Sequence, residues 1–132
     1  MASIDVVKQA NTMILAAATA LKSAPDYPTD NRFEKTVITY ATNFRFMARS
    51  AGFKNIIFDL RIDIKIPRKD LTDAMKFLAP LPELIGAVFV ADPTIGGKCQ
   101  TYEGDVTANL VTESINGMTT IGWEIVVPNV KI

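Results

Sequence analysis

The sequence FDLRIDIKI at residues 58–66 alternates strictly between apolar and charged residues. Apolar side chains stand at every second position, namely Phe58, Leu60, Ile62, Ile64 and Ile66. The charged side chains between them are Asp59, Arg61, Asp63 and Lys65. A period of two predicts a strand with one buried face and one solvated face, which is typical of an antiparallel or mixed sheet. We expect Pro67 to end this strand.

Before this strand, apolar residues recur at helical spacing from Ile4 to Leu21, with polar residues between them. Ser3 is a candidate N-cap, because its hydroxyl can accept a bond from a free backbone N–H. The spacing predicts one amphipathic helix over residues 3–22. We expect its apolar side to cover the buried face of the 58–66 strand.

The segment between helix and strand is less regular. Prolines and aspartates over residues 23–32 predict a surface loop. β-branched residues over 35–42 predict a second strand. Residues 44–54 match neither pattern and contain three basic residues and no acidic one, namely Arg45, Arg49 and Lys54.

After the 58–66 strand, Asp70 is a candidate N-cap of a short helix that should stop at Pro80. Pro82 suits the first turn of a second helix over residues 83–90. This second segment is largely apolar, so a buried strand is the alternative.

Residues 92–97 are rich in turn formers. Two β-rich runs follow, 99–115 and 118–132, and the Asn116-Gly117 pair between them is a strong hairpin signal. The last run has one apolar face, formed by Ile121, Trp123, Ile125 and Val127. The sequence therefore predicts one α+β domain over residues 1–132. Its mixed or mostly antiparallel sheet should be packed against an N-terminal helix and one or two short helices.

Composition excludes several classes of protein. Fourteen basic and fourteen acidic residues cancel, which disfavours a nucleic-acid binder held by phosphate contacts. The apolar stretch Met13–Leu21 is shorter than the ~20 residues that a bilayer span needs, so we expect no membrane segment. Cys99 is the only cysteine, which fits folding in a reducing cytoplasm.

Residues suited to catalysis are scarce. The chain has no histidine, which removes the commonest general base and metal ligand, and leaves Cys99 without an obvious activating partner. Gly96 and Gly97 are not followed by the Lys-Ser/Thr pair of a phosphate-binding loop. Asp59 and Asp63 should stand roughly 13 Å apart on one strand, too far to act as a carboxylate pair. We therefore expect no enzymatic activity, no metal and no cofactor.

The charges are unevenly distributed along the chain. Residues 32–54 contain one acid, Glu34, against the basic residues Arg32, Lys35, Arg45, Arg49 and Lys54. Residues 92–124 contain one base, Lys98, against the acidic residues Asp92, Glu103, Asp105, Glu113 and Glu124. Two solvated faces would explain this pattern. The alternative is a head-to-tail interface between copies, with Arg45, Arg49 and Lys54 on one side and Glu103, Asp105 and Glu113 on the other.

The loop formed by Asp92, Pro93, Thr94, Ile95, Gly96 and Gly97 resembles the Asp-Pro-Thr-Leu-Gly-Gly loop of the tail terminator proteins of long-tailed bacteriophages. Tyr27-Pro28, the strand end Ile66-Pro67-Arg68 and the late element Gly122-Trp123-Glu124 follow the family's order as well. The resemblance covers nearly the whole chain, although each motif is short, and residues 44–54 have no counterpart.

The resemblance implies a structural virion protein without catalytic activity. Tail terminators form a ring, typically a homohexamer, that caps the tail tube, ends its polymerisation and forms the joining surface for the head. Their partners are the tail tube protein and a head-completion or connector protein, and DNA passes through the ring without being read. The ring is assembled in the host cytoplasm and stays at the head-proximal end of the tail. The alternatives are a neighbouring head–tail connector, a minor tail-tube protein, or a small cytoplasmic ligand-binding or enzyme domain, for which a deep polar pocket would argue.

Overall fold

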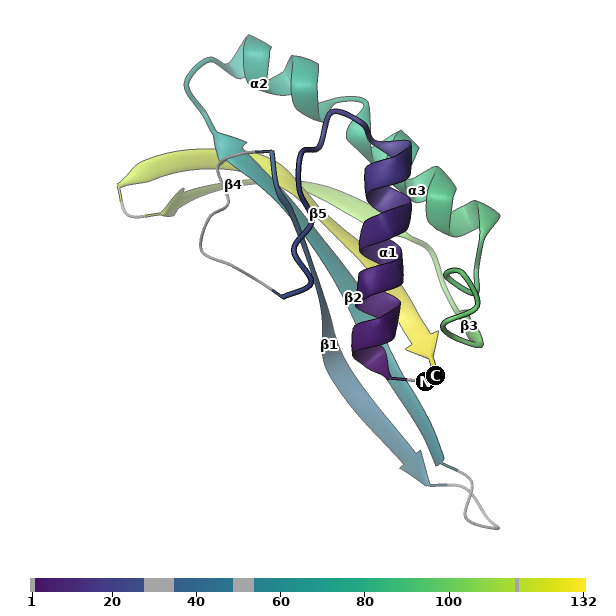
Figure 1. The fold of residues 1–132 in the computed structure, drawn as a ribbon. Coiled ribbons are helices and arrows are strands. Elements are labelled where there is room, and N and C mark those ends of the chain that lie inside the picture. The colour runs from purple at the N-terminus through teal and green to yellow at the C-terminus, as the bar shows by residue number, and fades with distance from the viewer. Residues whose placement is uncertain (1, 28–34, 49–53, 116) are drawn as a thin grey trace.

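The computed structural model describes residues 2–27, 35–48, 54–115 and 117–132. Their elements are α1 (Ser3–Ala17), β1 (Val37–Ala48), β2 (Lys54–Pro67), α2 (Leu71–Leu78), α3 (Leu81–Ala91), β3 (Thr101–Tyr102), β4 (Thr107–Ile115) and β5 (Met118–Lys131). Figure 1 shows three helices laid against a twisted sheet. The predicted α+β fold is confirmed.

The sheet is built around β2 and β5. β1 pairs with β2, β2 pairs with β5, and both β3 and β4 pair with β5 at different levels. Every pairing is antiparallel, and Ile64 lies between Val37 of β1 and Trp123 of β5. Among the described strands, β4 and the part of β1 beyond Val37 therefore form open edges on opposite sides of the sheet.

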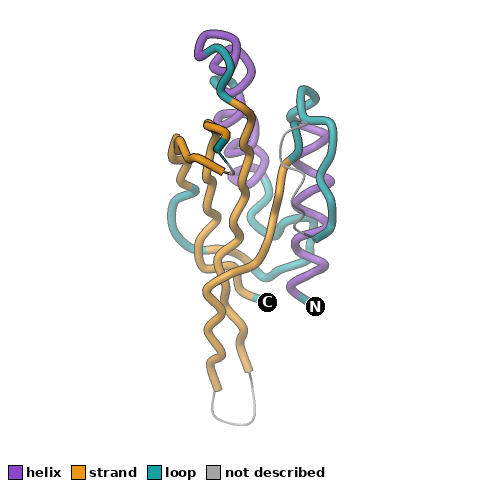
Figure 2. The backbone as a smooth tube through the Cα atoms, turned by 90° about the vertical axis from the view of Figure 1, so that its left-hand side faces the viewer, coloured by secondary structure: helices purple, strands orange, loops and turns teal. Residues whose placement is uncertain are grey.

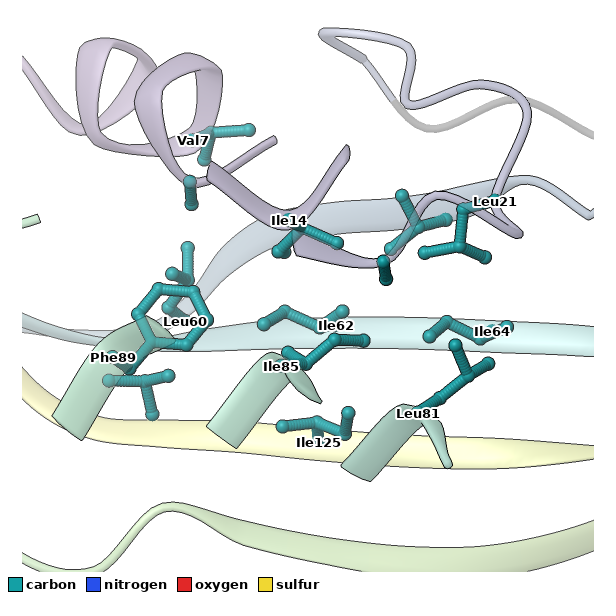
Figure 3. Close-up of a cluster of buried hydrophobic side chains, with 14 of the residues drawn as sticks. Val7, Ile14, Leu21, Leu60, Ile62, Ile64, Leu81, Ile85, Phe89 and Ile125 are labelled. Atoms are coloured by element: carbon teal, nitrogen blue, oxygen red, sulfur yellow. The ribbon is translucent and has the colours of Figure 1, made fainter. Parts of the chain in front are cut away.

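One face of the sheet carries the helices and the hydrophobic core. Leu60, Ile62 and Ile64 of β2 are fully buried, as the strict alternation of this strand predicts. Figure 3 shows them between Ile14 of α1 and Ile85 of α3. The expected packing of the 58–66 strand under the N-terminal helix is thus confirmed.

The N-terminal helix is shorter than predicted and starts differently. α1 ends at Ala17 rather than residue 22. Ser23 instead forms a parallel bridge with Thr36, and its carbonyl accepts the Val37 N–H at 3.0 Å, so the chain runs beside the start of β1. Ser3 is the first helical residue, not the cap, because Ala2 occupies the N-cap position.

The two short helices follow the sequence signals. The Asp70 carboxylate caps α2 by accepting the Thr72 N–H at 2.8 Å. α3 is a helix, which excludes the alternative of a buried strand. Together Leu71–Ala91 is apolar and long enough, at 21 residues, to cross a membrane, a stretch that the expectation from Met13–Leu21 overlooked. Here Ala79 and Pro80 separate two helices whose buried side chains cover the sheet.

The C-terminal hairpin forms as predicted, and its first run is divided. Ile115 pairs with Met118, and Gly117 before Met118 has φ of 77°, while Asn116 lies outside the described residues. Residues 99–115 do not form one strand: β3 covers two residues, and β4 begins at Thr107. Trp123 packs against the core, and its indole N–H donates to the carbonyl of Leu78 at 2.8 Å.

Candidate interaction surfaces

Two β-bulges lie side by side where the sheet narrows. One extra residue of β1 breaks the register with β2 between Thr42 and Arg45, and Asn43 there has φ of 62°. One extra residue of β5 breaks the register with β2 opposite Asp59, and Asn129 there has φ of 52°. Asparagine tolerates this left-handed backbone better than most residues. A bulge bends its strand and increases the local twist, so two at one level redirect the ribbon that continues beyond them.

The Asp59 carboxylate joins the two bulges. One oxygen accepts the Asn129 backbone N–H at 3.0 Å, and the other accepts the Asn43 side-chain amide at 3.0 Å. Arg45 adds an ion pair at 3.3 Å. Burial raises the pKa of Asp59, but the bonds from Asn129, Asn43 and Arg45 together outweigh burial and hold the pKa below its ordinary value.

Arg45 is also used within its own chain. Its guanidinium donates to the Asn43 carbonyl at 2.7 Å and to the Asn129 side-chain oxygen at 2.8 Å. The Asn129 amide in turn donates to the Glu103 carbonyl at 3.0 Å. Arg45 and the Glu103 backbone therefore contact the same amide in one subunit. Reversing the charge of Arg45 would therefore break contacts within one copy as well as any contact between copies.

Beyond the bulges, β1 and β2 continue as a projecting hairpin. β5 reaches its last pairing at Lys131, opposite Ile57, and the Ile132 N–H still donates to the Ile56 carbonyl. Further out, among the described residues, β1 and β2 pair only with each other, up to Ala48 opposite Lys54. Figures 1 and 2 show this ribbon extending past α1 and both termini.

Three phenylalanines form an aromatic ladder from the core onto this hairpin. Phe58 is fully buried, Phe44 is 42% exposed and Phe46 is 75% exposed. The ring centroids of Phe58 and Phe44 are 5.4 Å apart, and those of Phe44 and Phe46 are 6.1 Å apart in a stacked arrangement. The aromatic ladder thus carries apolar surface outward into solvent.

α3 has a second exposed apolar surface. Leu81, Ile85 and Phe89 face the sheet and are fully buried. The opposite side of the helix, which we name the outward α3 face, is formed by Leu84, Ala87, Val90 and Ala91. Leu84 is 43% exposed and Val90 69% exposed. Glu83 is also exposed on this side of the helix, one turn before Ala87, so the face is apolar only in part.

The helix-free face of the sheet is not the solvated face that the alternation predicted. Asp63 and Lys65 are buried to 6% and 5% exposure. Lys65 pairs with Glu113 of β4 and with Glu124 of β5, and Arg61 pairs with Glu124 at 2.7 Å. The alternation of one strand could not reveal these cross-strand partners, because they come from β4 and β5.

Asp63 is the least well satisfied member of this charge network. Its carboxylate lies 3.6 Å from Arg61 and accepts the Tyr40 hydroxyl at 3.3 Å, but one buried oxygen has no hydrogen-bond donor. Burial raises the pKa of Asp63, and the neighbouring Lys65 and Arg61 only partly offset it. Burial and the charge of Asp63 likewise raise the pKa of Tyr40.

The Asp92–Gly97 loop is held by bonds from its own side chains and by one buried residue. The Asp92 carboxylate accepts the Gly96 N–H at 2.8 Å and the Thr94 hydroxyl at 2.8 Å, and these bonds lower its pKa. Ile95 is fully buried, although its φ of 49° is unusual for a β-branched residue. Gly96 and Gly97 follow with φ of 63° and 78°. The loop therefore anchors the end of α3 to the core.

The three acidic residues of the predicted interface, which the structure describes, do not gather into one patch. Arg45 and Glu113 are held in pairs within the chain, and Arg49 lies outside the described residues. Lys54 begins β2, but its side chain also lies outside the described part. Glu103 and Asp105 are exposed in the β3–β4 loop. Glu103 lies near Lys131 and Glu113 opposite Thr120, so roughly 30 Å of β5 separates them.

The described residues offer little for catalysis. Burial and then the charge of Asp92 raise the pKa of Cys99 to about 11, so its thiol stays protonated. A pocket of about 410 Å³ is open to solvent and is lined in part by Lys35, Asp70 and Phe77. Asp70 already caps α2, and the Lys35 ammonium lies 5.0 Å from the centre of the Phe77 ring. Among the described residues, no cluster of carboxylates and cysteine could hold a metal ion.

Comparison with known proteins gives no assignment: no family model matches the chain, and no curated protein matches it either.

Proposed function

We propose that this protein is a structural subunit that assembles head to tail into a closed ring, and that the ring is a tail terminator of a long-tailed bacteriophage. The ring caps the tail tube, ends its polymerisation and offers a joining surface to the head. The proposal includes no catalysis and no cofactor.

The observation that carries the ring is the pair of open sheet edges. β1 and β4 lie on opposite sides of the sheet, and the successive antiparallel pairings make them run in opposite directions. β4 of one copy beside β1 of the next would therefore continue the same antiparallel ladder. Open edges with free N–H and C=O groups favour pairing with another strand. A contact between two different edges repeats around a ring if its rotation closes.

The terminator role is supported by the ordered motifs around the Asp92–Gly97 loop, and by the surface chemistry. Exposed apolar side chains lie on the projecting hairpin and on α3, and the pocket beside Asp70 and Phe77 is open to solvent. A ligand-binding domain would instead bring free polar groups together in a deep cavity.

Light scattering coupled to size-exclusion chromatography tests the ring. The full chain would be measured alone and after mixing with the tail tube protein of the same genome. We expect a hexamer-sized species in at least one of the two samples. A monomer in both would contradict the proposal.

A further inference from the structure

β4 is an edge strand without the features that usually protect an edge. Its sequence, TANLVTESI at Thr107–Ile115, contains no proline, no lysine and no arginine, and its register with β5 has no bulge. Natural sheets use such features to stop an edge from pairing with other strands. β1 is covered at its start by Ser23 and interrupted by the bulge at Asn43, so β4 offers the longer uninterrupted edge.

Little of the subunit packs around β4. Among the described strands it pairs with β5 alone, and residues 107–110 are exposed. Leu110 lies in the same row of the sheet as the core residue Trp123, yet its side chain is 47% exposed. Segments with so few buried contacts open locally at low cost. A strand that receives a partner binds more tightly when it is ordered beforehand, because ordering it during binding costs free energy.

The one charged residue of β4 links this strand to β2. The Lys65 ammonium of β2 pairs with the Glu113 carboxylate of β4 and lies 3.6 Å from the Glu124 carboxylate of β5. Lys65 is buried, whereas the two carboxylates are partly exposed. Side chains of three strands therefore meet at one buried cation, and Glu113 leaves no unpaired charge on the β4 edge.

Gly122 allows Lys65 to reach β4. Gly122 lies on β5 between Lys65 and Val111 in one row of the sheet. Because glycine has no side chain, the Lys65 side chain can extend across β5 toward Glu113 on the next strand. A Cβ at Gly122 would overlap the Ile64 carbonyl, which shows how closely β5 approaches β2 at this point.

A buried ion pair contributes little net stability, because both groups lose their water, and its best-attested role is to select one arrangement of the chain. We propose that Lys65 is a positioning residue, which holds β4 in the orientation in which its free edge receives β1 of the next copy. This role rests on the proposed ring, since a ring closes only if every contact repeats with the same rotation. Loss of the Lys65–Glu113 pair should leave the fold intact and disturb assembly.

Amide hydrogen exchange of the full chain tests the positioning of β4. Glu113→Gln removes the charge on β4 and leaves Lys65 paired with Glu124. We expect exchange over residues 107–115 to become about tenfold faster, with a melting temperature close to that of the wild type. Lys65→Met, whose side chain has a similar length and no charge, should give the same local increase.

Glu103→Gln is the matched control, because Glu103 is 69% exposed before β4 and lies 3.9 Å from Lys131, a residue of β5. Its exchange over residues 107–115 should equal that of the wild type. An unchanged rate in Glu113→Gln would overturn the positioning role. An equal increase over α1 and β2 would show a general loss of stability, and would overturn it as well.

Light scattering then measures assembly, alone and with the tail tube protein of the same genome. We expect Glu113→Gln to assemble at least tenfold more weakly than the wild type or into particles of mixed size, and Glu103→Gln to assemble normally. Uniform rings of Glu113→Gln at wild-type strength would overturn the role of Lys65 and leave the proposed function standing. Failure of the wild type to assemble in either sample would overturn both. Protection of the β4 amides by the tube protein while the chain stays monomeric would assign this edge to that protein and overturn the contact between copies.

Discussion

Asp59 and Asn129 are joined by a 3.0 Å hydrogen bond from a backbone N–H to a carboxylate, which holds the bulge of β5 in place. Because the same carboxylate binds Asn43 on β1, one side chain fixes two neighbouring bulges. Those bulges stand at the base of the projecting hairpin. Asp59 therefore positions the aromatic ladder without being part of it.

Asp59→Asn should lower the free energy of unfolding by about 1–2 kcal/mol at pH 7, because it removes the ion pair and an acceptor for Asn43. The pKa of Asp59 is lowered in the folded state, so its contribution is present above the ordinary aspartate value of about 3.9 and is lost as the pH falls through the folded pKa. Urea unfolding of the variant and the wild type from pH 7 to pH 3 measures this. If the difference in free energy of unfolding between the variant and the wild type grew toward low pH, the lowered pKa of Asp59 would be contradicted.

Asp63→Asn should behave in the opposite way, although Asp63 lies on the same strand. The pKa of Asp63 is raised in the folded state. The protonated carboxyl therefore stabilises the fold below about pH 3.9, and this stabilisation is lost as the pH rises through the folded pKa. Arg61 and Lys65 keep Glu124 as a partner in the variant. We expect a stability equal to the wild type or up to about 1 kcal/mol higher at pH 7. A loss of several kcal/mol in the same urea series would show that the charge of Asp63 is required.

Gly122→Ala should cost more than about 3 kcal/mol. Gly122 lies within β5 between β2 and β4, and a Cβ there would overlap the Ile64 carbonyl and lie 2.8 Å from the Lys65 Cα. Gly86→Ala in α3 is the matched control, since nothing lies within 4 Å of its Cβ. The control should gain about 0.5–1 kcal/mol from helix propensity. Equal melting temperatures for Gly122→Ala and Gly86→Ala would contradict the close approach of β2 and β5.

Leu60→Asp tests the register of β2. Leu60 is fully buried in the core, so an aspartate there would be buried without a partner and should cost several kcal/mol. The matched change is Leu110→Asp on β4, where the side chain is 47% exposed, and we expect this variant to melt close to the wild type. A wild-type melting temperature for Leu60→Asp would show that its side chain does not face the core.

Local signals predicted most of the fold. The signals for the 58–66 strand, for the Asp70 cap and for a hairpin between 115 and 118 each act within a few residues, and the structure has all three elements. The true end of α1 was not predictable from periodicity, because residues 22 and 23 are held by Lys35 and Val37 across the loop.

The candidate surfaces depended more on tertiary structure. Residues 44–54 matched no pattern because a bulge at Asn43 interrupts the period of β1. The six charged residues were chosen by their nearness in sequence, but Glu113 lies opposite Thr120 and Glu103 near Lys131, far apart along β5. Pairs such as Lys65 with Glu113 bring together residues that no local pattern connects.

The central claim is that the chain forms a ring that ends a tail tube. Its most direct test is electron microscopy of tubes grown from the tail tube protein of the same genome, with and without the full chain. We expect the chain to shorten the tubes and to appear as a closed ring at one end of each. Tubes that grow to the same length with bare ends in the presence of the chain would contradict the account.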